Sequence, residues 1–170
     1  MPVELQNAVA LSKALKQYTP DLAKETQKEI AGHLRKVVNQ ARGFVPAQSP
    51  LSGWGNQTGI WEYRAFNAGL MKRGIGYSTT PTKPNKRGFR SLATIFNKSA
   101  AGAIYETAGR KSGVTGNFTP KLGGQLKGDK QKMTGRAIFR AFEEDQGKAT
   151  AGVIKAIERS AAKFNAKVKG

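Results

Sequence analysis

The spacing of apolar residues predicts helices in the first quarter of the chain. Apolar positions recur at steps of three and four over residues 3–17, which is typical of an amphipathic helix. A longer helix is predicted over residues 20–43, with Thr19 as its N-cap, Pro20 at its first position and Gly43 at its end. The residues expected on its inward face are Leu22, Thr26, Ile30, Leu34, Val37 and Ala41.

A second helical region is predicted at the C-terminal end. Thr134 is expected to cap a helix that contains Ile138 and Phe142, and apolar residues then recur at steps of three and four as far as Val168. Gly147 and Gly152 each cost about 1 kcal/mol relative to alanine, so we expect a kink or break near them. The opposite face is basic, with Lys155, Arg159, Lys163 and Lys167. Such a face is compatible with a membrane surface, but the narrow apolar stripe favours packing against the protein's own sheet.

The middle of the chain favours strands and loops. Residues 44–59 are rich in Pro, Ser, Gly and Asn and predict a loop, whereas residues 60–67, 71–79 and 89–97 predict three strands of a small antiparallel sheet. The run SAAGAIYETAG has no decisive period, although Ala103, Ile104 and Ala108 suit one face of a short helix. Residues 109–128 contain six glycines and few apolar residues, which indicates a flexible arm.

These elements predict an α+β fold in one domain over residues 1–170. A small antiparallel sheet is expected to be packed by the long N-terminal helix and the C-terminal helix. The expected order is N-terminal helices at 1–43, loop and sheet at 44–108, a flexible Gly/Lys-rich arm at 109–132, and a helical region at 133–170.

Composition excludes several kinds of active site. The chain has no cysteine and one histidine, His33, so thiolate metal sites, His-based zinc sites and catalytic triads lack the necessary residues. The consecutive Glu143, Glu144 and Asp145 point in different directions on a helix and are interpreted as a solvated face. The glycine-rich segment also lacks the spacing of a nucleotide-binding loop. We therefore expect no catalytic residues, no metal, no cofactor and no enzymatic activity.

Localisation follows from two further features. No apolar run approaches the roughly 20 residues that a membrane-spanning helix needs, and the first residues lack the layout of a signal peptide. We expect a cytoplasmic protein with no membrane partner.

Net charge predicts a polyanionic partner. The chain has 29 Lys and Arg against 11 Asp and Glu, a net charge of +18, and residues 61–135 hold 14 basic and 3 acidic side chains. Non-specific contact with DNA phosphates is the favoured interpretation. Base stacking on the interleaved aromatic residues, a solubilising role and an acidic partner protein stay open. The candidate DNA-facing residues are Arg64, Lys72, Arg73, Lys83, Lys86, Arg87, Arg90, Arg110, Lys111, Lys121 and Lys127.

Two tryptophans at the end of the predicted loop are candidate partner contacts. Trp54 lies between two glycines, and Trp61 follows closely. Exposed tryptophans in loops often become interface hot spots. For Trp54, capping the core of its own domain is the equal alternative.

Three segments together resemble the tail-completion or neck proteins that join head to tail in long-tailed bacteriophages. The first is the predicted helix from TPDLAKETQKEI followed by ARGFVPAQSPLSGW. The second, IFNKSAAGAIYETAGRK, is similar to the family's Asn, small residues and aromatic-Glu-x-x-Gly pattern. The third, GRAIFRAFEED, is similar to the start of the family's closing helix. Where many relatives have a short segment with Pro-Phe-x-x-Pro, this chain has the long Gly/Lys-rich arm.

The resemblance implies an α+β virion protein that acts in the head–tail junction after assembly in the host cytoplasm. It implies a homo-oligomeric ring, contacts with other joining and tail-terminator or tail-tube proteins, and non-specific contact with double-stranded DNA in the lumen. It implies no turnover chemistry. Two alternatives remain: a free-standing architectural DNA-binding protein, for which the net charge is equally suitable, and a DNA-processing enzyme, which lacks an identifiable set of catalytic residues.

Overall fold

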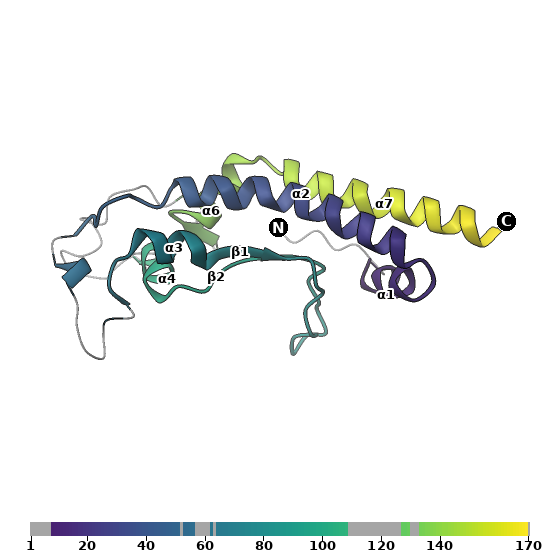
Figure 1. Cartoon of the computed structure of the whole chain (residues 1–170), viewed down its shortest axis with the longest axis horizontal. Helices are drawn as coiled ribbons and strands as arrows, with labels where there is room; N and C mark the ends of the chain where they lie inside the picture. The colour runs from purple at the N-terminus through teal and green to yellow at the C-terminus, as the bar shows by residue number, and fades with distance from the viewer. Residues whose placement is uncertain are drawn as a thin grey trace. The chain divides into compact units, whose positions relative to one another are not determined.

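Helices make up most of the fold. The computed structural model describes residues 8–51, 53–56, 62, 64–108, 127–129 and 133–169. The helices in these ranges are α1 (Ala8–Tyr18), α2 (Pro20–Gly43), α3 (Ala68–Gly74), α4 (Ala100–Thr107), α6 (Ile138–Glu144) and α7 (Lys148–Lys169), with a short 3-10 turn, η1 (Trp54–Asn56) (Figure 1). None of these helices is long and apolar enough to cross a membrane.

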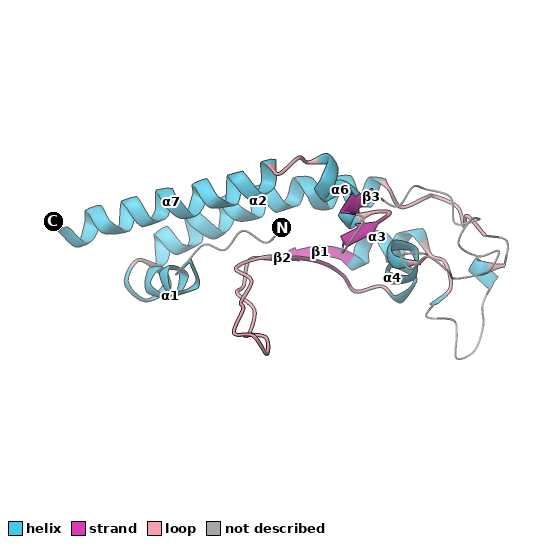
Figure 2. Ribbon diagram, turned by 180° about the vertical axis from the view of Figure 1, so that it is seen from behind, coloured by secondary structure: helices cyan, strands magenta, loops and turns pink. Residues whose placement is uncertain are grey.

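The strands form two small sheets. Strand β1 (Ile75–Ser78) pairs with β2 (Thr94–Asn97), and β3 (Lys127–Asp129) pairs antiparallel with β4 (Met133–Gly135), with Gly128 opposite Thr134 (Figure 2). Together with the helices they confirm the predicted α+β class.

The chain groups into two compact units. Unit 1 comprises Met1–Lys36, Tyr77–Thr94 and Gly147–Gly170, and unit 2 comprises Val37–Gly76 and Ile95–Gln146. The expectation of a single domain over residues 1–170 stays a prediction.

Unit 1 contains an antiparallel packing of α7 against α2 (Figure 1). The hydroxyls of Thr26 on α2 and Ser160 on α7 are hydrogen-bonded at 2.5 Å, and both side chains are buried. Further along, Gly152 of α7 lies directly against the imidazole of His33, where a Cβ would collide with the ring. A glycine inside α7 therefore allows the two helices to approach closely.

Helix α1 packs against α2 in an apolar cluster of unit 1. Leu15 packs with Leu22 and Ala23 of α2, and the partly buried Leu11 and Phe164 lie against them. Thr19 lies between α1 and α2, and its hydroxyl donates to the Leu15 carbonyl of α1 at 3.4 Å. Thr19 therefore bonds back to α1 through its side chain.

The core of unit 2 is formed by side chains of α2, α3 and β1. Val37 and Val38 of α2, Met71 of α3 and Ile75 of β1 are its largest fully buried side chains. Helix α3 begins because the Asn67 side chain accepts the Leu70 N–H as an N-cap.

Several predicted elements are corrected by the structure. Among the described residues of the 60–67 strand prediction, none is in a strand, and the start of the 71–79 prediction is the end of α3. In the SAAGAIYETAG segment, α4 buries Ala101, Gly102 and Tyr105, whereas Ala103 is exposed. Its N-cap, Ser99, accepts the Gly102 N–H.

The region before the last helices is also corrected. Lys127–Asp129 form strand β3, although the sequence predicts an arm as far as residue 132. Thr134 lies in β4 rather than at a helix N-cap. The helical region breaks after α6, where Gln146 and Gly147 have positive φ angles of 52° and 78°. This break confirms the one predicted near Gly147.

Candidate functional site

A buried carboxylate in unit 2 caps the start of α6. Glu106 of α4 is 4 % exposed, and its two carboxylate oxygens accept the N–H groups of Ala137, Ile138 and Phe139 at 2.8, 3.1 and 2.9 Å. The first N–H groups of a helix have no partner within the helix and carry a partial positive charge. The Glu106 side chain therefore replaces the N-cap that the sequence assigns to Thr134.

A buried guanidinium holds the same two segments from the other side. Arg136 is 3 % exposed and donates through one Nη to the carbonyls of Tyr105 and Ala108, at 2.9 and 2.6 Å. Its guanidinium also lies 5.9 Å from the centre of the Tyr105 ring. Residues 105–108 and 135–139 are thus linked by two buried charged side chains, and we call Tyr105, Glu106 and Arg136 the Glu106–Arg136 cluster.

Burial changes the ionisation of this cluster. Desolvation raises the pKa of Tyr105, and the nearby guanidinium groups of Arg136 and Arg140 act in the opposite direction. Desolvation also lowers the pKa of Arg136, while Tyr105 and Glu106 partly compensate. An arginine nevertheless stays protonated at neutral pH, so Arg136 acts here as a fixed donor.

Glycines next to the cluster are required by close packing. A Cβ at Gly135 would overlap the Glu106 carboxylate, and a Cβ at Gly102 would overlap the Asn97 amide. The Asn97 side chain also caps the next turn by accepting the Ser99 N–H. Side chains cannot replace these glycines without displacing the capping groups.

The segment after α2 joins the same cluster. The Tyr105 hydroxyl donates to the Phe44 carbonyl at 3.3 Å, and the Arg140 guanidinium lies 3.9 Å from the centre of the Phe44 ring. Arg42 donates twice to the Ile75 carbonyl, at 2.7 and 3.2 Å. All three segments behind the phage-neck resemblance therefore contribute residues to one packed region of unit 2.

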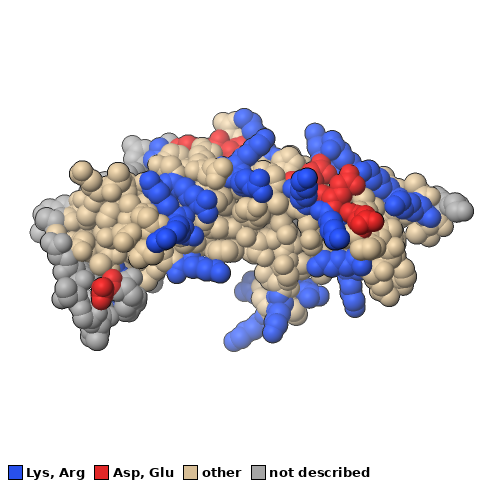
Figure 3. Space-filling model, viewed as in Figure 1, with Lys and Arg blue, Asp and Glu red and all other residues tan. Residues whose placement is uncertain are grey.

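Four of the candidate DNA-facing residues lie on one loop of unit 1. Residues 79–93 connect β1 to β2, contain four basic and no acidic side chains, and are called the basic hairpin below. Lys83, Lys86, Arg87 and Arg90 are all exposed. Figure 3 shows Lys and Arg gathered on this hairpin.

The tip of the basic hairpin is a defined turn. The Gly88 N–H donates to the Asn85 carbonyl, and the Asn85 N–H donates to the Phe89 carbonyl, both at 2.9 Å. Gly88 has a φ of +77°. This is the pattern of a type I turn followed by a left-handed residue in a three-residue hairpin loop. The Asn85 carboxamide oxygen also accepts the N–H groups of Arg87 and Phe89.

The stem of the hairpin is hydrogen-bonded as well. The Thr82 N–H donates to the Ser91 carbonyl, and the Ser91 N–H donates to the Thr82 hydroxyl, each at 2.9 Å. The Arg90 Nε donates to the Thr82 carbonyl at 3.1 Å, which fixes one edge of its guanidinium. Lys86 and Arg87 are therefore presented at the two central turn positions of a preformed loop.

The other candidate DNA-facing residues lie outside residues 79–93. Arg64 and Arg73 are exposed and Lys72 is half-buried, and all three belong to unit 2. Lys127 lies in strand β3. Arg110, Lys111 and Lys121 lie outside the described residues.

Trp54 is part of the core of unit 2. It is 4 % exposed, its indole N–H donates to the Arg64 carbonyl at 2.8 Å, and its ring lies 5.3 Å from that of Phe66. Of the two alternatives for Trp54, the structure shows the one in which it caps its own unit, because the flanking chain folds back over it. Trp61 lies outside the described residues.

The basic face of α7 is partly neutralised by α2. Arg159 forms an ion pair with Glu29 at 2.8 Å, and Lys163 forms one with Glu25 at 2.6 Å. The Lys163 hydrogen bond and charge lower the pKa of Glu25. These contacts place the helix against a neighbouring helix of the same unit.

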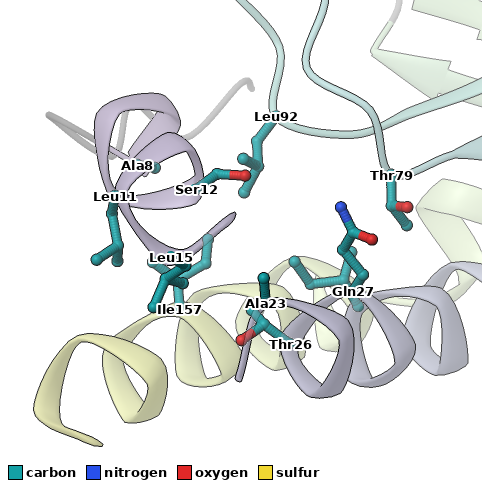
Figure 4. A pocket seen from close by; sticks show the side chains of 11 residues that line it. Ala8, Leu11, Ser12, Leu15, Ala23, Thr26, Gln27, Thr79, Leu92 and Ile157 are labelled. Atoms are coloured by element: carbon teal, nitrogen blue, oxygen red, sulfur yellow. The ribbon is translucent and has the colours of Figure 1, made fainter. Parts of the chain in front are cut away.

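A small apolar groove lies at the base of the basic hairpin. It encloses about 370 Å³, including space open to solvent, and is lined by 11 residues from α1, α2, α7 and the hairpin base. Figure 4 shows Leu92 of the hairpin beside Ser12 of α1, and Thr79 beside Gln27 of α2. None of the lining residues has a titratable side chain, so the groove has no acid, base or activated nucleophile.

The acidic residues offer no metal site within the described ranges, where no three His, Cys, Asp or Glu side chains are grouped to hold an ion. Glu144, one of three consecutive carboxylates, accepts from Arg140 and Gln40 at 2.9 and 3.0 Å. Its position fits the solvated-face interpretation.

Comparisons with protein-family models, curated proteins and solved structures found no match to this chain.

Proposed function

We propose that this chain is a structural component of a bacteriophage head-to-tail junction, a neck or tail-completion protein that forms a ring around the path of the genome. The supporting observation is the Glu106–Arg136 cluster. Three segments far apart in the sequence suggest the resemblance, and their residues are each other's partners. The Tyr105 hydroxyl donates to the Phe44 carbonyl, Glu106 accepts the N–H groups of residues 137–139, and Arg136 donates to the carbonyls of Tyr105 and Ala108.

This convergence gives the three segments one physical role. Each segment alone is a weak sign of family, but together they build a rigid region with two buried charges and glycines at positions of close contact. A rigid unit with a fixed shape suits closed assembly, because identical patches on each copy must fit their neighbours around the ring. In this proposal the protein acts by geometry and charge, without turnover chemistry or a cofactor.

The proposal includes protein and nucleic-acid partners. The ring would contact the other head–tail joining proteins and the tail-terminator or tail-tube proteins. Double-stranded DNA would pass through its lumen, where excess positive charge favours contact with phosphates without reading sequence. The finished protein would be located in the virion, after assembly in the host cytoplasm.

The second candidate function is that of an architectural DNA-binding protein. It is favoured by the basic hairpin, which unites four exposed cations and needs no ring to meet DNA. The two functions differ in where the protein is found. A junction protein is a stoichiometric part of the particle, whereas an architectural protein is distributed along DNA.

The test is interruption of the gene in the phage that encodes it, with wild-type protein supplied in trans as the control. We expect DNA-filled heads and complete tails that stay unattached, and attachment should return on complementation. Intact virions assembled without this chain would overturn the proposal. A defect in DNA content with normal joining would instead support the architectural function.

A further inference from the structure

We propose that the basic hairpin is a preformed, sequence-independent binding site for the phosphates of duplex DNA, with Lys86 and Arg87 as its principal contacts. This inference deepens the proposed function by naming which basic residues meet DNA. It rests on that function only for the place where DNA is encountered, because binding itself is a property of the isolated chain.

The basic hairpin has a high local positive charge. Residues 79–93 contain four cations and no carboxylate. By contrast, Arg159 and Lys163 on α7 are paired with glutamates of α2. A polyanion that approaches the hairpin therefore meets four cations with no carboxylate among residues 79–93, and each phosphate contact releases condensed counterions.

The tip of the hairpin is pre-organised. Asn85 and Gly88 close the tip with backbone hydrogen bonds, and the Asn85 side chain accepts two further N–H groups. Lys86 and Arg87 are consequently held at adjacent exposed positions before any ligand arrives. Binding then loses less conformational freedom than it would with an unstructured basic loop.

The side chains of the hairpin suit recognition of phosphates better than recognition of bases. Phe89, the aromatic residue at the tip, is half-buried, and its amide is held by the Asn85 side chain. Stacking on bases requires an aromatic face that is open to single-stranded nucleic acid. Exposed cations on a hairpin loop instead suit the backbone of a duplex, which is contacted without sequence information.

The experiment measures binding of the full-length protein to a fluorescent 30-base-pair duplex across a salt series. The variant K86Q/R87Q removes two charges from the tip. We expect its affinity to fall roughly tenfold near 0.1 M salt, and the slope of log affinity against log salt to become shallower by about 2, since each phosphate contributes about 0.9. Two duplexes of unrelated sequence should give equal affinities.

The matched control is K24Q/K28Q. Lys24 and Lys28 are exposed on α2 of the same unit, so this variant has the same loss of net charge without touching the hairpin. We expect it to keep most of the salt slope. Equal losses in both variants would show that binding follows net charge, and would overturn the hairpin as the site.

A second variant tests the preformed turn at constant charge. In G88V a β-branched residue must occupy a φ of +77°, which glycine adopts readily and a β-branched residue does not. We expect binding about fivefold weaker, because the competent loop is less populated. Unchanged binding by G88V would refute the pre-organisation argument.

Competition with poly-glutamate separates the two kinds of polyanion. If poly-glutamate displaced DNA at equal charge concentration, the hairpin would be a site for acidic proteins and the inference would fail. The proposed function is tested independently, because K86Q/R87Q that joins heads to tails yet binds DNA normally would overturn only this inference.

Discussion

Replacing Glu106 with glutamine should destabilise unit 2 far more than the small chemical change suggests. One carboxylate oxygen accepts the N–H groups of Ala137 and Ile138, and the other accepts that of Phe139. A glutamine offers one oxygen and one NH₂ group, so at least one helix N–H would face another donor.

The magnitude follows from the contacts that are lost. A hydrogen bond to a charged group contributes about 1.5–3 kcal/mol, and the favourable interaction of the carboxylate with the helix N-terminus adds about 0.3–1 kcal/mol, or up to about 2 when partly buried. We therefore expect E106Q to lose about 2–4 kcal/mol of unfolding free energy. E106A also leaves the buried Arg136 without its nearby negative charge, and should lose about 3–5 kcal/mol.

The assay is urea unfolding of the full chain, followed by tryptophan fluorescence, to which the buried Trp54 of unit 2 contributes. Amide hydrogen exchange at residues 137–139 gives the local readout, and these amides should lose protection in E106Q. The matched control is E144Q, the same change at a carboxylate in an exposed ion pair with Arg140, which should cost about 0–1 kcal/mol. Equal effects of E106Q and E144Q would refute the capping role of Glu106.

Three further predictions follow from the same contacts. Because burial raises the pKa of Tyr105, its phenol should ionise at a higher pH in the folded than in the unfolded chain, as an absorbance titration at 295 nm would show; stability should therefore fall as pH rises above about 10. G102A places a Cβ on an asparagine amide and should cost about 1–3 kcal/mol, whereas G43A, where a Cβ meets nothing, should be near neutral, as thermal unfolding would show. The pKa of Glu25 is lowered by Lys163, so the stability from this pair should be present at neutral pH and lost as pH falls through the Glu25 pKa; K163A should remove that acid dependence in unfolding curves from pH 3 to 7.

The sequence predicts the local parts of the fold well. All six residues of the predicted inward face of α2 are buried, and the helix begins at Pro20 and ends at Gly43. The break near Gly147 is also confirmed. These features depend on periodicity and on single residues with strong conformational preferences, which a sequence displays directly.

Features that depend on distant partners could not be predicted. Glu106 and Arg136 are thirty residues apart, and nothing in either neighbourhood shows that they are buried together. The sequence does contain an indication of α3, because Asn67 is a possible N-cap and is followed by the helix formers Ala, Leu and Met. The aromatic and β-branched residues around this segment nevertheless favour strands. Glycines beside Trp54 suggest exposure, whereas the carbonyl of Arg64 and the ring of Phe66 enclose it.

The sequence predicts which residues make up the candidate DNA site, but not the conformation of the loop that presents them. The turn residues of PTKPNKRG and the basic side chains around them are visible in the sequence. The hydrogen bonds that hold Lys86 and Arg87 at the tip depend on Asn85 and Gly88 acting together. Charge alone therefore names many residues, and the structure places four of them on one hairpin.

The proposed function is tested most directly by electron cryomicroscopy of the purified phage particle at its head–tail junction. We expect copies of this chain in a closed ring that is coaxial with the tail, with the basic hairpins directed toward the DNA in the lumen. A well-resolved junction that contains no copy of this chain would contradict the account.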